Sequence, residues 1–518
     1  MVHDVGPRAP LGRRNFLKLS GATATAVAWG INAPDAKATP ARPAPDNVFG
    51  LGVASGDPRP DGVVLWTRLA PEPLAADGHG GMPPDPVPVQ YQVAEDTLFR
   101  RVVRSGQALA SPELAHAVHP EVTGLRPDRE YFYRFRVGTQ ISPVGRTRTL
   151  PAPGQPVSSF SFASASCQAW YHGYFSPYRH MAEEDLDMVL FLGDYIYEYG
   201  IVAGDNLWRQ GASVGSEHGV EIQTLEQYRL RYSLFKTDPH LQAVHAAAPW
   251  LITWDDHEVQ NNYGADESQY GISPQDFLYR RAIAYRAFYE NLPLSLSTLP
   301  QGPQARIHRR FDYGSLVRFN LIDERQYRGP VPANLDEQYA EQRSILGYEQ
   351  EKWLYQGMTN SPATWNVVAT GDVVTAVGDN NVDMWDGFPA ARRRLTDVMQ
   401  HTRNPVVLAG DVHKHVASEL KADFSDPAST TVGVELICTS IASDGDGSQD
   451  TGSSAWVKHP YVRGYDARRG YLHVRMTPNE LISDFKIVPW IEQDADAPIQ
   501  TSFRFATPAG RPSLERLI

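Results

Sequence analysis

Short apolar runs alternate with helix-like segments along most of this chain. Runs rich in apolar residues lie at positions 188–192, 250–254, 316–322, 365–369 and 406–409. Helical patterns lie at 176–185, 225–235, 275–291 and 389–400. Strands that are apolar along their whole length are buried on both faces, as in a sheet covered by helices. The alternation therefore predicts an α/β domain over residues 157–490.

The preceding residues, 47–150, follow a different pattern, with short alternating strands, frequent turn signals and no clear helix. Tyr131 follows Gly124-Leu125-Arg126-Pro127, a sequence similar to the corner of fibronectin type III domains, where a tyrosine hydroxyl bonds back to the chain. We expect a small fibronectin III-like β-sandwich here, joined to the α/β domain by the stiff proline-rich linker 151–156.

The C-terminal part predicts a hairpin and then irregular chain. Strand-like segments at 471–476 and 481–488 flank a turn at 478–480. Residues 491–518 are rich in proline and alanine, and we expect an extended tail over the surface. The Gly/Ser-rich residues 200–220 are expected to form a loop over the strand ends.

The first 38 residues have the features of an export signal. Arg13-Arg14 begins a twin-arginine motif, a mild Ala/Gly/Thr-rich stretch follows, and Ala36-Lys37-Ala38 offers a cleavage site. The alternative is a disordered basic tail. We expect export by the twin-arginine machinery to the periplasm or the medium. The sequence has no run of 18 apolar residues, so no transmembrane segment is predicted.

The net charge of −12 restricts the choice of partner. The first 38 residues contain five basic and two acidic side chains, so their removal would leave a still more acidic protein. Stable binding to nucleic-acid phosphates by charge alone is therefore not expected. Any chemistry on phosphate groups would need bound cations to offset the acidic field.

Acidic clusters follow three of the predicted strands. They are Gly193-Asp194-Tyr195-Ile196-Tyr197-Glu198, Asp255-Asp256-His257-Glu258 and Gly410-Asp411-Val412-His413. Because ligands gather at the carboxyl ends of strands in such sheets, the three clusters predict one metal site. The alternative for the second cluster is an acid-rich helix N-terminus, which is common.

A first metal would be held by Cys167, Asp194, Tyr197 and His413. A phenol binds a metal as phenolate, and a strongly acidic ion such as Fe³⁺ removes its proton at neutral pH, whereas the alternative for Tyr197 is a buried aromatic. Cys167 follows a predicted strand at 160–163 and is a candidate thiolate ligand. In an exported protein the alternative is a disulfide with Cys438, the other cysteine of the chain.

A second metal would take oxygen ligands from Asp194, Asp256, Asn261 and Asp411. Such a set favours calcium, magnesium or manganese over zinc. Two neighbouring cations would clamp a phosphoryl group and activate a water molecule, with no covalent nucleophile.

The catalytic candidates are His257, Asp255 and Arg325. His257 is free to face the substrate and protonate a leaving oxygen. Arg325 would either hold a phosphate or pair with Asp323. Two other motifs are weaker: Gly371-Asp372 is interpreted as a structural turn, and Gly211-Ala212-Ser213-Val214-Gly215 spells a serine-hydrolase elbow without the preceding strand that such an elbow needs.

These segments resemble the PhoD-like alkaline phosphatases, within the calcineurin-like metallophosphoesterases. The matching stretches are Gly52–Pro58, Val64–Leu69, Ser166–Gln168, Gly193–Glu198, Trp254–Val259 with Asn261-Asn262, Asp323–Arg328, Trp385–Ala390 and Gly410–His413. The resemblance implies a four-layer α/β/β/α core, one Fe³⁺ and one or two Ca²⁺. It implies iron on Cys167, Asp194, Tyr197 and His413, and calcium on Asp194, Asp256, Asn261 and Asp411, with Asn262 as the adjacent alternative.

The expected activity is hydrolysis of phosphate mono- or diesters outside the cytoplasm, with phospholipid head groups among the candidate substrates. One alternative is a phospholipase D-like phosphodiesterase on the same scaffold. Another is a catalytically dead surface binding protein. A dead homologue usually loses metal ligands, whereas this sequence retains every expected one.

Overall fold

The computed structural model describes residues 47–378, 382–448 and 454–518. The predicted signal peptide, residues 1–38, lies outside the described residues. The helices are α2 (Ser176–Glu183), α3 (Leu225–Lys236), α4 (Pro239–Ala247), α5 (Pro274–Asn291), α6 (Leu335–Gln338), α7 (Tyr348–Thr359) and α8 (Pro389–Met399). Six 3-10 turns are η1 (Pro112–Leu114), η2 (Trp170–His172), η3 (Ser216–His218), η4 (Leu296–Thr298), η5 (Trp385–Gly387) and η6 (Trp456–Lys458).

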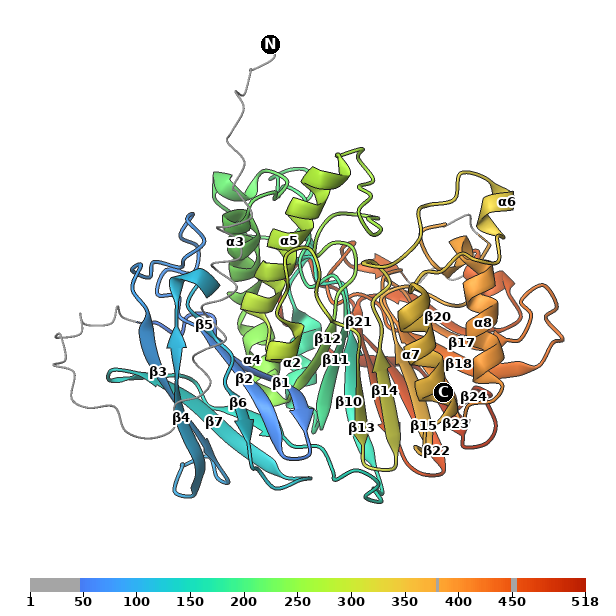
Figure 1. Cartoon of the computed structure of the whole chain (residues 1–518), viewed down its shortest axis with the longest axis horizontal. Coiled ribbons are helices and arrows are strands. Elements are labelled where there is room, and N and C mark those ends of the chain that lie inside the picture. The colour runs from blue at the N-terminus through green and yellow to red at the C-terminus, as the bar shows by residue number, and fades with distance from the viewer. Residues whose placement is uncertain (1–46, 379–381, 449–453) are drawn as a thin grey trace, which may run out of the picture. The chain divides into compact units, whose positions relative to one another are not determined.

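Two large sheets form the centre of the fold (Figure 1). The first contains, in spatial order, β24 (Glu515–Arg516), β23 (Gln500–Pro508), β22 (Glu480–Ile487), β21 (Gly470–Met476), β10 (Phe160–Ala165), β11 (Met188–Leu192), β12 (Trp250–Thr253), β1 (Val53–Arg59), β2 (Gly62–Arg68) and β5 (Ala117–Val118), with β6 (Glu121–Thr123) also paired to β2. The second contains β13 (Arg309–Tyr313), β14 (Val317–Leu321), β15 (Trp365–Ala369), β16 (Pro405–Ala409), β18 (Thr431–Ile437), β17 (His415–Lys421), β20 (Val462–Arg468) and β19 (Gly447–Ser448).

The alternation of side chains along β11 explains the layers. Val189 and Phe191 pack in one apolar cluster with residues of α2 to α5, whereas Leu190 and Leu192 pack in another with strands of the second sheet. On the second sheet Val407 packs against the side that carries α7 and α8. Successive side chains of a strand point to opposite faces, so each central strand serves two cores. The predicted α/β/β/α order is confirmed.

A third sheet belongs to the N-terminal region. It contains β4 (Val102–Ala110), β3 (Val87–Ala94), β7 (Glu130–Val137) and β8 (Gln140–Ile141), with β9 (Gly145–Arg148) also paired to β7. The predicted tyrosine corner is present, because the backbone N–H of Arg126 donates to the Tyr131 hydroxyl at 3.0 Å. Together with β1, β2, β5 and β6 this sheet makes the antiparallel N-terminal β domain.

The border of that domain differs from the prediction of a separate sandwich. Strand β1 pairs in parallel with β12, with Gly56 opposite Trp250, so the first sheet of the N-terminal domain continues into the core. A Cβ at Gly56 would lie 2.9 Å from the Trp250 carbonyl oxygen and 2.3 Å from that of Pro293. The absence of a side chain therefore permits this close approach.

The C-terminal residues also differ from the expected surface tail. Residues 500–508 form β23, which pairs antiparallel with β22, and residues 515–516 add β24 to its other side. Phe503 and Phe505 of β23 are buried in the core between the sheets. The proline-rich flanks of this strand gave the whole segment an irregular appearance in the sequence.

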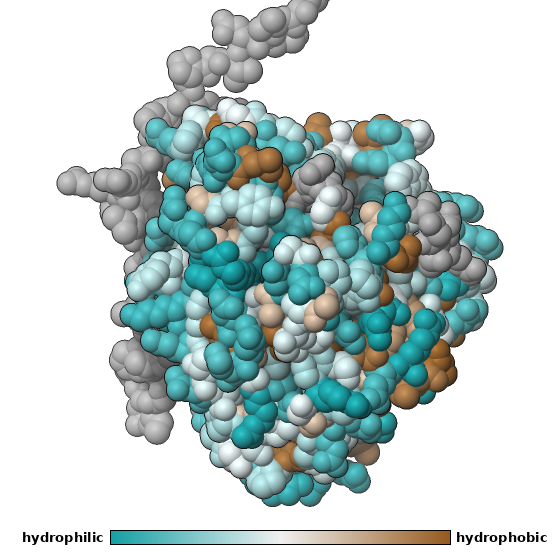
Figure 2. All heavy atoms as spheres, turned by 90° about the vertical axis from the view of Figure 1, so that its right-hand side faces the viewer, coloured by the Kyte–Doolittle hydropathy of each residue, from teal (hydrophilic) through white to brown (hydrophobic). Residues whose placement is uncertain are grey.

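None of the described helices has both the length and the apolar character that crossing a bilayer would need. Among the described residues visible in Figure 2, hydrophobic side chains form small separate groups within a mostly hydrophilic surface.

Candidate metal centre

The ends of β10, β11 and β16 carry residues with unusual backbone conformations. Cys167, Asp194, Asp411 and His413 all have φ between 53° and 60°, the left-handed region that side chains other than glycine seldom adopt. All four were predicted as ligands from the sequence. Strained backbone of this kind persists where the surrounding structure holds it, and it is concentrated at functional sites.

The first group of candidate ligands contains a thiol, a carboxylate, an imidazole and a phenol. Ligand atoms of Cys167, Asp194 and His413 lie within 4.8 Å of one another. The Tyr197 hydroxyl donates to Asp194 Oδ2 at 3.0 Å and lies 3.2 Å from His413 Nε2. Asp444 Oδ2 lies 2.7 Å from His413 Nδ1, an arrangement that leaves Nε2 for a metal.

The pKa values of these side chains are consistent with a site that binds a cation. Burial and the neighbouring charge of Asp194 raise the pKa of the Cys167 thiol and of the Tyr197 phenol well above their usual values. Burial lowers the pKa of His413, so its imidazole is neutral and able to bind a metal. Both cysteines are free and buried, so the disulfide alternative is not formed in this structure.

A second group consists of carboxylates. Oxygen atoms of Asp194, Asp255, Asp256 and Asp411 lie within 4.8 Å of one another. Asp194 Oδ1, Asp255 Oδ2 and Asp256 Oδ1 are buried without a hydrogen-bond partner among the described residues. Burial, together with the neighbouring carboxylates, raises the pKa of Asp194 and of Asp411 well above the usual value. Bound cations would supply partners for these oxygens, so the residues present fit a metal centre.

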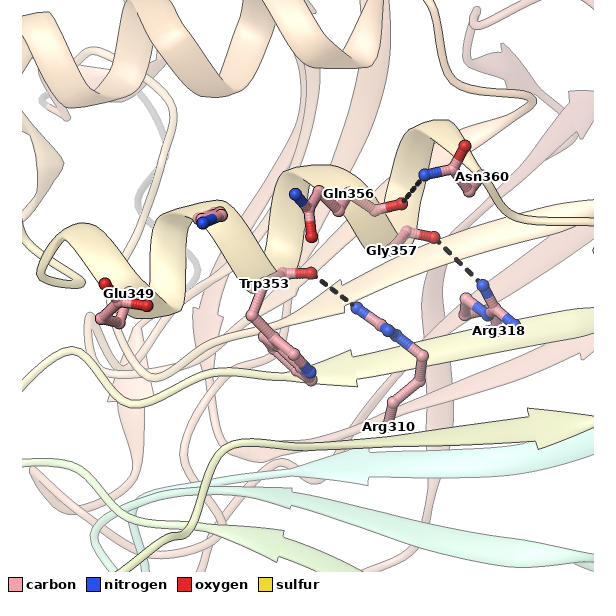
Figure 3. A pocket seen from close by; sticks show the side chains of 8 residues that line it. Arg310, Arg318, Glu349, Trp353, Gln356, Gly357 and Asn360 are labelled. Atoms are coloured by element: carbon pink, nitrogen blue, oxygen red, sulfur yellow. Dashed lines mark hydrogen bonds between the residues drawn. The ribbon is translucent and has the colours of Figure 1, made fainter.

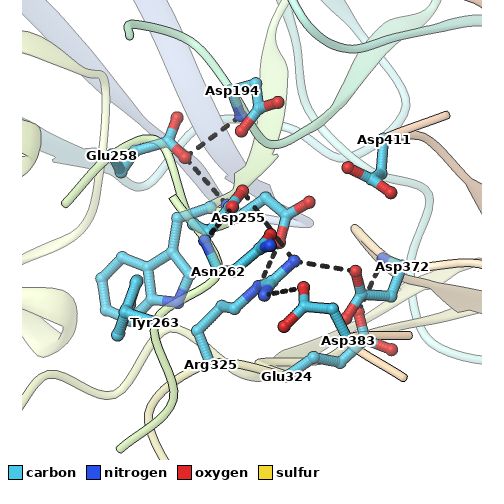
Figure 4. A network of polar contacts seen from close by, with 12 residues as sticks. Asp194, Asp255, Glu258, Asn262, Tyr263, Glu324, Arg325, Asp372, Asp383 and Asp411 are labelled. Carbon is cyan, nitrogen blue, oxygen red and sulfur yellow. Dashed lines mark hydrogen bonds and ion pairs between the residues drawn. The ribbon is translucent and has the colours of Figure 1, made fainter. Parts of the chain in front are cut away.

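Arg325 makes contacts that differ from both sequence interpretations. Its guanidinium donates to Asp255 Oδ1 at 2.5 Å, to Asp383 Oδ2 at 2.6 Å and to Asp372 Oδ1 at 2.8 Å (Figure 4). Its side chain is 1% exposed. The bond from Arg325 to Asp323 Oδ1 comes from the backbone N–H of Arg325, at 3.1 Å, and not from its guanidinium. A buried guanidinium surrounded by carboxylates is engaged by them, so Arg325 joins the loops that carry Asp255, Asp372 and Asp383.

Asp372 is more than the turn residue that its Gly-Asp motif suggested. It is fully buried, binds Arg325, and its backbone N–H donates to Glu324 Oε2 at 2.9 Å. Gly371 leaves room for Asp255, whose Cγ would lie 2.9 Å from a Cβ at that position. The missed signal was a fourth strand-end acid, after β15, which joins the others because parallel strands end at one edge.

Glu258 fixes two of the metal-site loops to each other. Its Oε2 accepts from the backbone N–H groups of Asp194, at 3.1 Å, and Asp255, at 2.8 Å, and its Oε1 accepts from that of Tyr195 at 2.6 Å. Burial raises the pKa of Glu258 to about 8. Gly193, with φ of 98°, allows the crossing, because a Cβ there would lie 2.5 Å from the Asp255 Cβ. The sequence analysis gave Glu258 no role.

His257 lies beside the acidic group and is held by a second buried glutamate. Its Nδ1 is 2.7 Å from Glu198 Oε2, and one of its nitrogens lies within 4.8 Å of ligand atoms of Asp194 and Asp256. Burial opposes protonation, but the charges of Asp256, Glu198 and Asp194 outweigh it and raise the pKa of His257 well above its usual value. In the metal-free protein the side chain is therefore protonated, which makes it a candidate proton donor.

Asn261 and the adjacent Asn262 make different contacts at this end of the site. Its side-chain amide donates to Gln269 Oε1 at 2.5 Å, and its backbone N–H donates to Glu198 Oε1 at 2.7 Å. The backbone N–H of Asn262 instead donates to Asp256 Oδ2 at 2.6 Å, and Figure 4 shows Asn262 among the Arg325 network. The sequence spacing alone did not separate these adjacent amides.

Two other features lie apart from these residues. A cavity of about 350 Å³ beside β13, β14 and α7 has none of the candidate ligands in its lining (Figure 3). Its arginines donate to helix carbonyls, Arg310 to Trp353 at 3.0 Å and Arg318 to Gly357 at 3.1 Å. Ser213 of the elbow-like sequence is exposed in the loop before η3, without the strand-to-helix setting of a nucleophile.

Comparison with known proteins agrees with the fold and with the family resemblance. Residues 162–485 match the PhoD-like phosphatase family, and residues 35–151 match the PhoD-like phosphatase N-terminal domain. Alkaline phosphatase D of Bacillus subtilis (strain 168) is 44% identical over 466 residues, which are 87% of this chain and 79% of that protein.

Solved structures give the same result. A structure of PhoD superposes with a TM-score of 0.86 at 42% identity and covers 94% of each chain. Purple acid phosphatase PPD1 from yellow lupin (Lupinus luteus) seeds has a TM-score of 0.54 at 11% identity over 88% of this chain and 73% of that chain, which shows a shared fold alone.

The layers and the strand-end ligands define a protein with the metallophosphoesterase fold. Within that class, the chain belongs to the PhoD-like phosphatase family.

Proposed function

We propose that this protein hydrolyses phosphate esters at the centre formed by the strand-end ligands. The observation that carries the proposal is the group of four carboxylates, three of which have a buried, unpartnered oxygen, beside a thiol, a phenol and an imidazole. Among the described residues, the ion pairs to those four carboxylates are the two from Arg325, to Asp255 and Asp256. One guanidinium does not balance four carboxylates, so the arrangement is suited to hold cations. Family membership supports the same activity.

Two kinds of metal are proposed. Cys167, Asp194, Tyr197 and His413 would hold Fe³⁺, because a thiolate and a phenolate both suit a strongly acidic ion. Asp194, Asp256 and Asp411, with the amide of Asn261 or Asn262, would hold one or two Ca²⁺ ions. When bound, the cations would lower the pKa of a water molecule and offset charge on the phosphoryl group.

The chain's own residues then have separate tasks. Protonated His257 donates its proton to the leaving oxygen, and Glu198 fixes its orientation through Nδ1. Arg325 and Glu258 hold the acidic loops in register without contact to the substrate. The site is preorganised by these buried partners, so the loops need little rearrangement when a phosphate ester binds.

Location is proposed from the sequence alone. The twin-arginine motif at Arg13-Arg14 supports export through the twin-arginine machinery, which carries folded proteins. That route suits a protein that acquires its metals inside the cell. The place of action would be the periplasm or the medium, with a small phosphate mono- or diester as substrate.

The test combines elemental analysis with two assays. Protein purified after export is expected to contain iron and calcium and to hydrolyse p-nitrophenyl phosphate, bis(p-nitrophenyl) phosphate or both. Asp411→Asn should abolish turnover, whereas Asp426→Asn, in an exposed loop, should leave it unchanged. Full activity of the Asp411 variant, or of metal-free protein, would refute the proposal. Release of choline from phosphatidylcholine at a rate above that for either ester would favour the phospholipase D-like alternative.

A further inference from the structure

An exposed indole lies next to the candidate metal centre with its own polar group already satisfied. Trp208, in the loop between β11 and α3, is 39% exposed. Its Nε1–H donates to the Asp205 carbonyl oxygen at 2.8 Å. The exposed part of the side chain is therefore an apolar aromatic surface. A partly exposed indole contributes little to the stability of the fold. Its fixed orientation therefore suggests a role in binding.

The indole stacks on a histidine that belongs to the centre's surroundings. The rings of Trp208 and His172 are 4.1 Å apart at an interplanar angle of 15°. His172 Nδ1 accepts from the backbone N–H of Asp444 at 3.1 Å, and Asp444 holds His413. The two stacked rings, here called the aromatic ledge, are thus separated from a candidate iron ligand by a single residue.

The ledge is held rigidly from below. The backbone N–H groups of Trp208 and Arg209 both donate to the Tyr171 carbonyl oxygen, at 2.8 and 3.1 Å. The Arg209 guanidinium is buried, pairs with Asp238 at 2.8 Å and lies over the Trp170 ring at 4.6 Å. A Cβ on Gly445 would lie 3.4 Å from Trp208, so the loop that carries Asp444 contacts the indole. The preorganised indole would lose little entropy when a planar group stacks on it.

We propose that the aromatic ledge of Trp208 and His172 binds a planar aromatic or heteroaromatic ring attached to the phosphate ester. The substrate class is therefore esters whose organic group carries such a ring, with nucleotide-like phosphates as the type. This inference rests on the proposed function, because it places the phosphoryl group at the metal centre. Aromatic side chains recognise ring faces without regard to ring identity, so the ledge selects for a ring rather than for one base.

The test uses two ligands that differ only by the ring, adenosine 5′-monophosphate and ribose 5-phosphate. Binding to the full metal-loaded protein is measured by calorimetry, and hydrolysis is measured for the same pair. Trp208→Ala should weaken binding of the adenosine compound about five-fold to about a hundred-fold and leave ribose 5-phosphate within two-fold. Trp208→Phe, which keeps a ring, should restore most of the loss. The control is Tyr348→Ala, which removes an aromatic side chain 74% exposed elsewhere.

The outcomes separate the two claims. Equal loss for both ligands in Trp208→Ala would assign the indole a purely structural role and overturn the inference, as would no loss for either. If the wild-type protein binds both compounds and hydrolyses neither these nor aryl phosphates, the proposed function fails while the binding comparison still decides on the ledge.

Discussion

The phenol oxygen of Tyr197 lies 3.2 Å from Nε2 of His413, although 216 positions separate the two residues in the sequence. The two side chains come from the ends of β11 and β16, which belong to different sheets. Ser443 Oγ also donates to this phenol oxygen at 2.7 Å, which favours the phenolate form once a cation replaces the proton. The shared edge at which both sheets end thus places the Tyr197 phenol and the His413 imidazole close enough to bind the same metal ion.

A visible absorption band is the first expected outcome of that arrangement. Phenolate and thiolate ligands to Fe³⁺ give charge-transfer bands, so the purified protein should be coloured. Tyr197→Phe should weaken or shift the band. Tyr199→Phe should not, because it removes the hydroxyl of a ring that packs 5.3 Å from His257 and is outside the assigned ligand set. The measurement is the visible spectrum per bound iron. A colourless and fully active wild-type protein would contradict the iron assignment.

Replacement of Arg325 should be among the most destabilising single changes. Arg325→Met leaves Asp255, Asp372 and Asp383 without their common cation, and loss of one partner of a buried ion pair costs about 3–5 kcal/mol. The control, Arg393→Met, breaks an exposed pair with Glu341, for which about 1 kcal/mol or less is expected. Denaturant unfolding of both variants in the presence of metals measures the difference, and equal effects would argue against the network.

The two adjacent asparagines should have unequal effects on calcium. We expect Asn261→Ala to reduce calcium content and turnover more than Asn262→Ala. The Asn261 amide donates through Nδ2 to Gln269, a bond that does not use its Oδ1, whereas Asn262 contacts Asp256 through a backbone N–H that alanine keeps. Loss of one oxygen ligand should weaken calcium binding at the second site and leave the visible spectrum of the iron unchanged. Elemental analysis of both variants reads out each metal separately. A larger loss of calcium in Asn262→Ala would assign the ligand to the adjacent amide instead.

Local patterns in the sequence were sufficient for the central strands, for several helices and for most of the candidate residues that the structure brings together. Met188 to Leu192 is apolar throughout because each face of β11 meets a different core, and Asp194 follows where that burial ends. Roles that depend on a distant partner were not visible. From the sequence, Arg325 is either a phosphate binder or a partner of Asp323. Its pairs with Asp255 and Asp372 were not predicted, since ion pairing between loops of different strands leaves no periodic pattern.

The C-terminal strand escaped prediction for a related reason. Phe503 and Phe505 alternate with polar residues, as a half-buried strand requires, but proline-rich flanks obscured the pattern. Pairing of β23 with β22 then supplies the backbone hydrogen bonds that local sequence does not specify. Whether such a segment forms a strand depends on its pairing with a strand that is distant in the sequence, and that pairing exists only in the folded chain.

Metal removal should reverse the pH dependence of stability. In the metal-free protein, burial and the neighbouring carboxylates raise the pKa of Asp194 and of Asp411, and the acidic field raises the pKa of His257 despite burial. The folded state therefore keeps protons that the unfolded chain loses above about pH 4 for carboxyl groups and above about pH 6.5 for histidine. A state that binds more protons when folded loses stability as pH rises. The metal-loaded protein should show the opposite trend at this site, because its ligands must be deprotonated to bind cations.

The difference in Tm between metal-loaded and chelator-treated protein should therefore widen from about pH 5 to about pH 9. Titratable groups outside the centre affect the Tm of both samples equally, so their contributions cancel in that difference. In chelated protein, Asp411→Asn should lessen the fall of Tm with pH, because it removes one carboxyl group whose pKa is raised. Parallel curves for the loaded and chelated protein would show that the buried carboxylates do not share their charge with a bound cation, and would remove the physical basis for the centre.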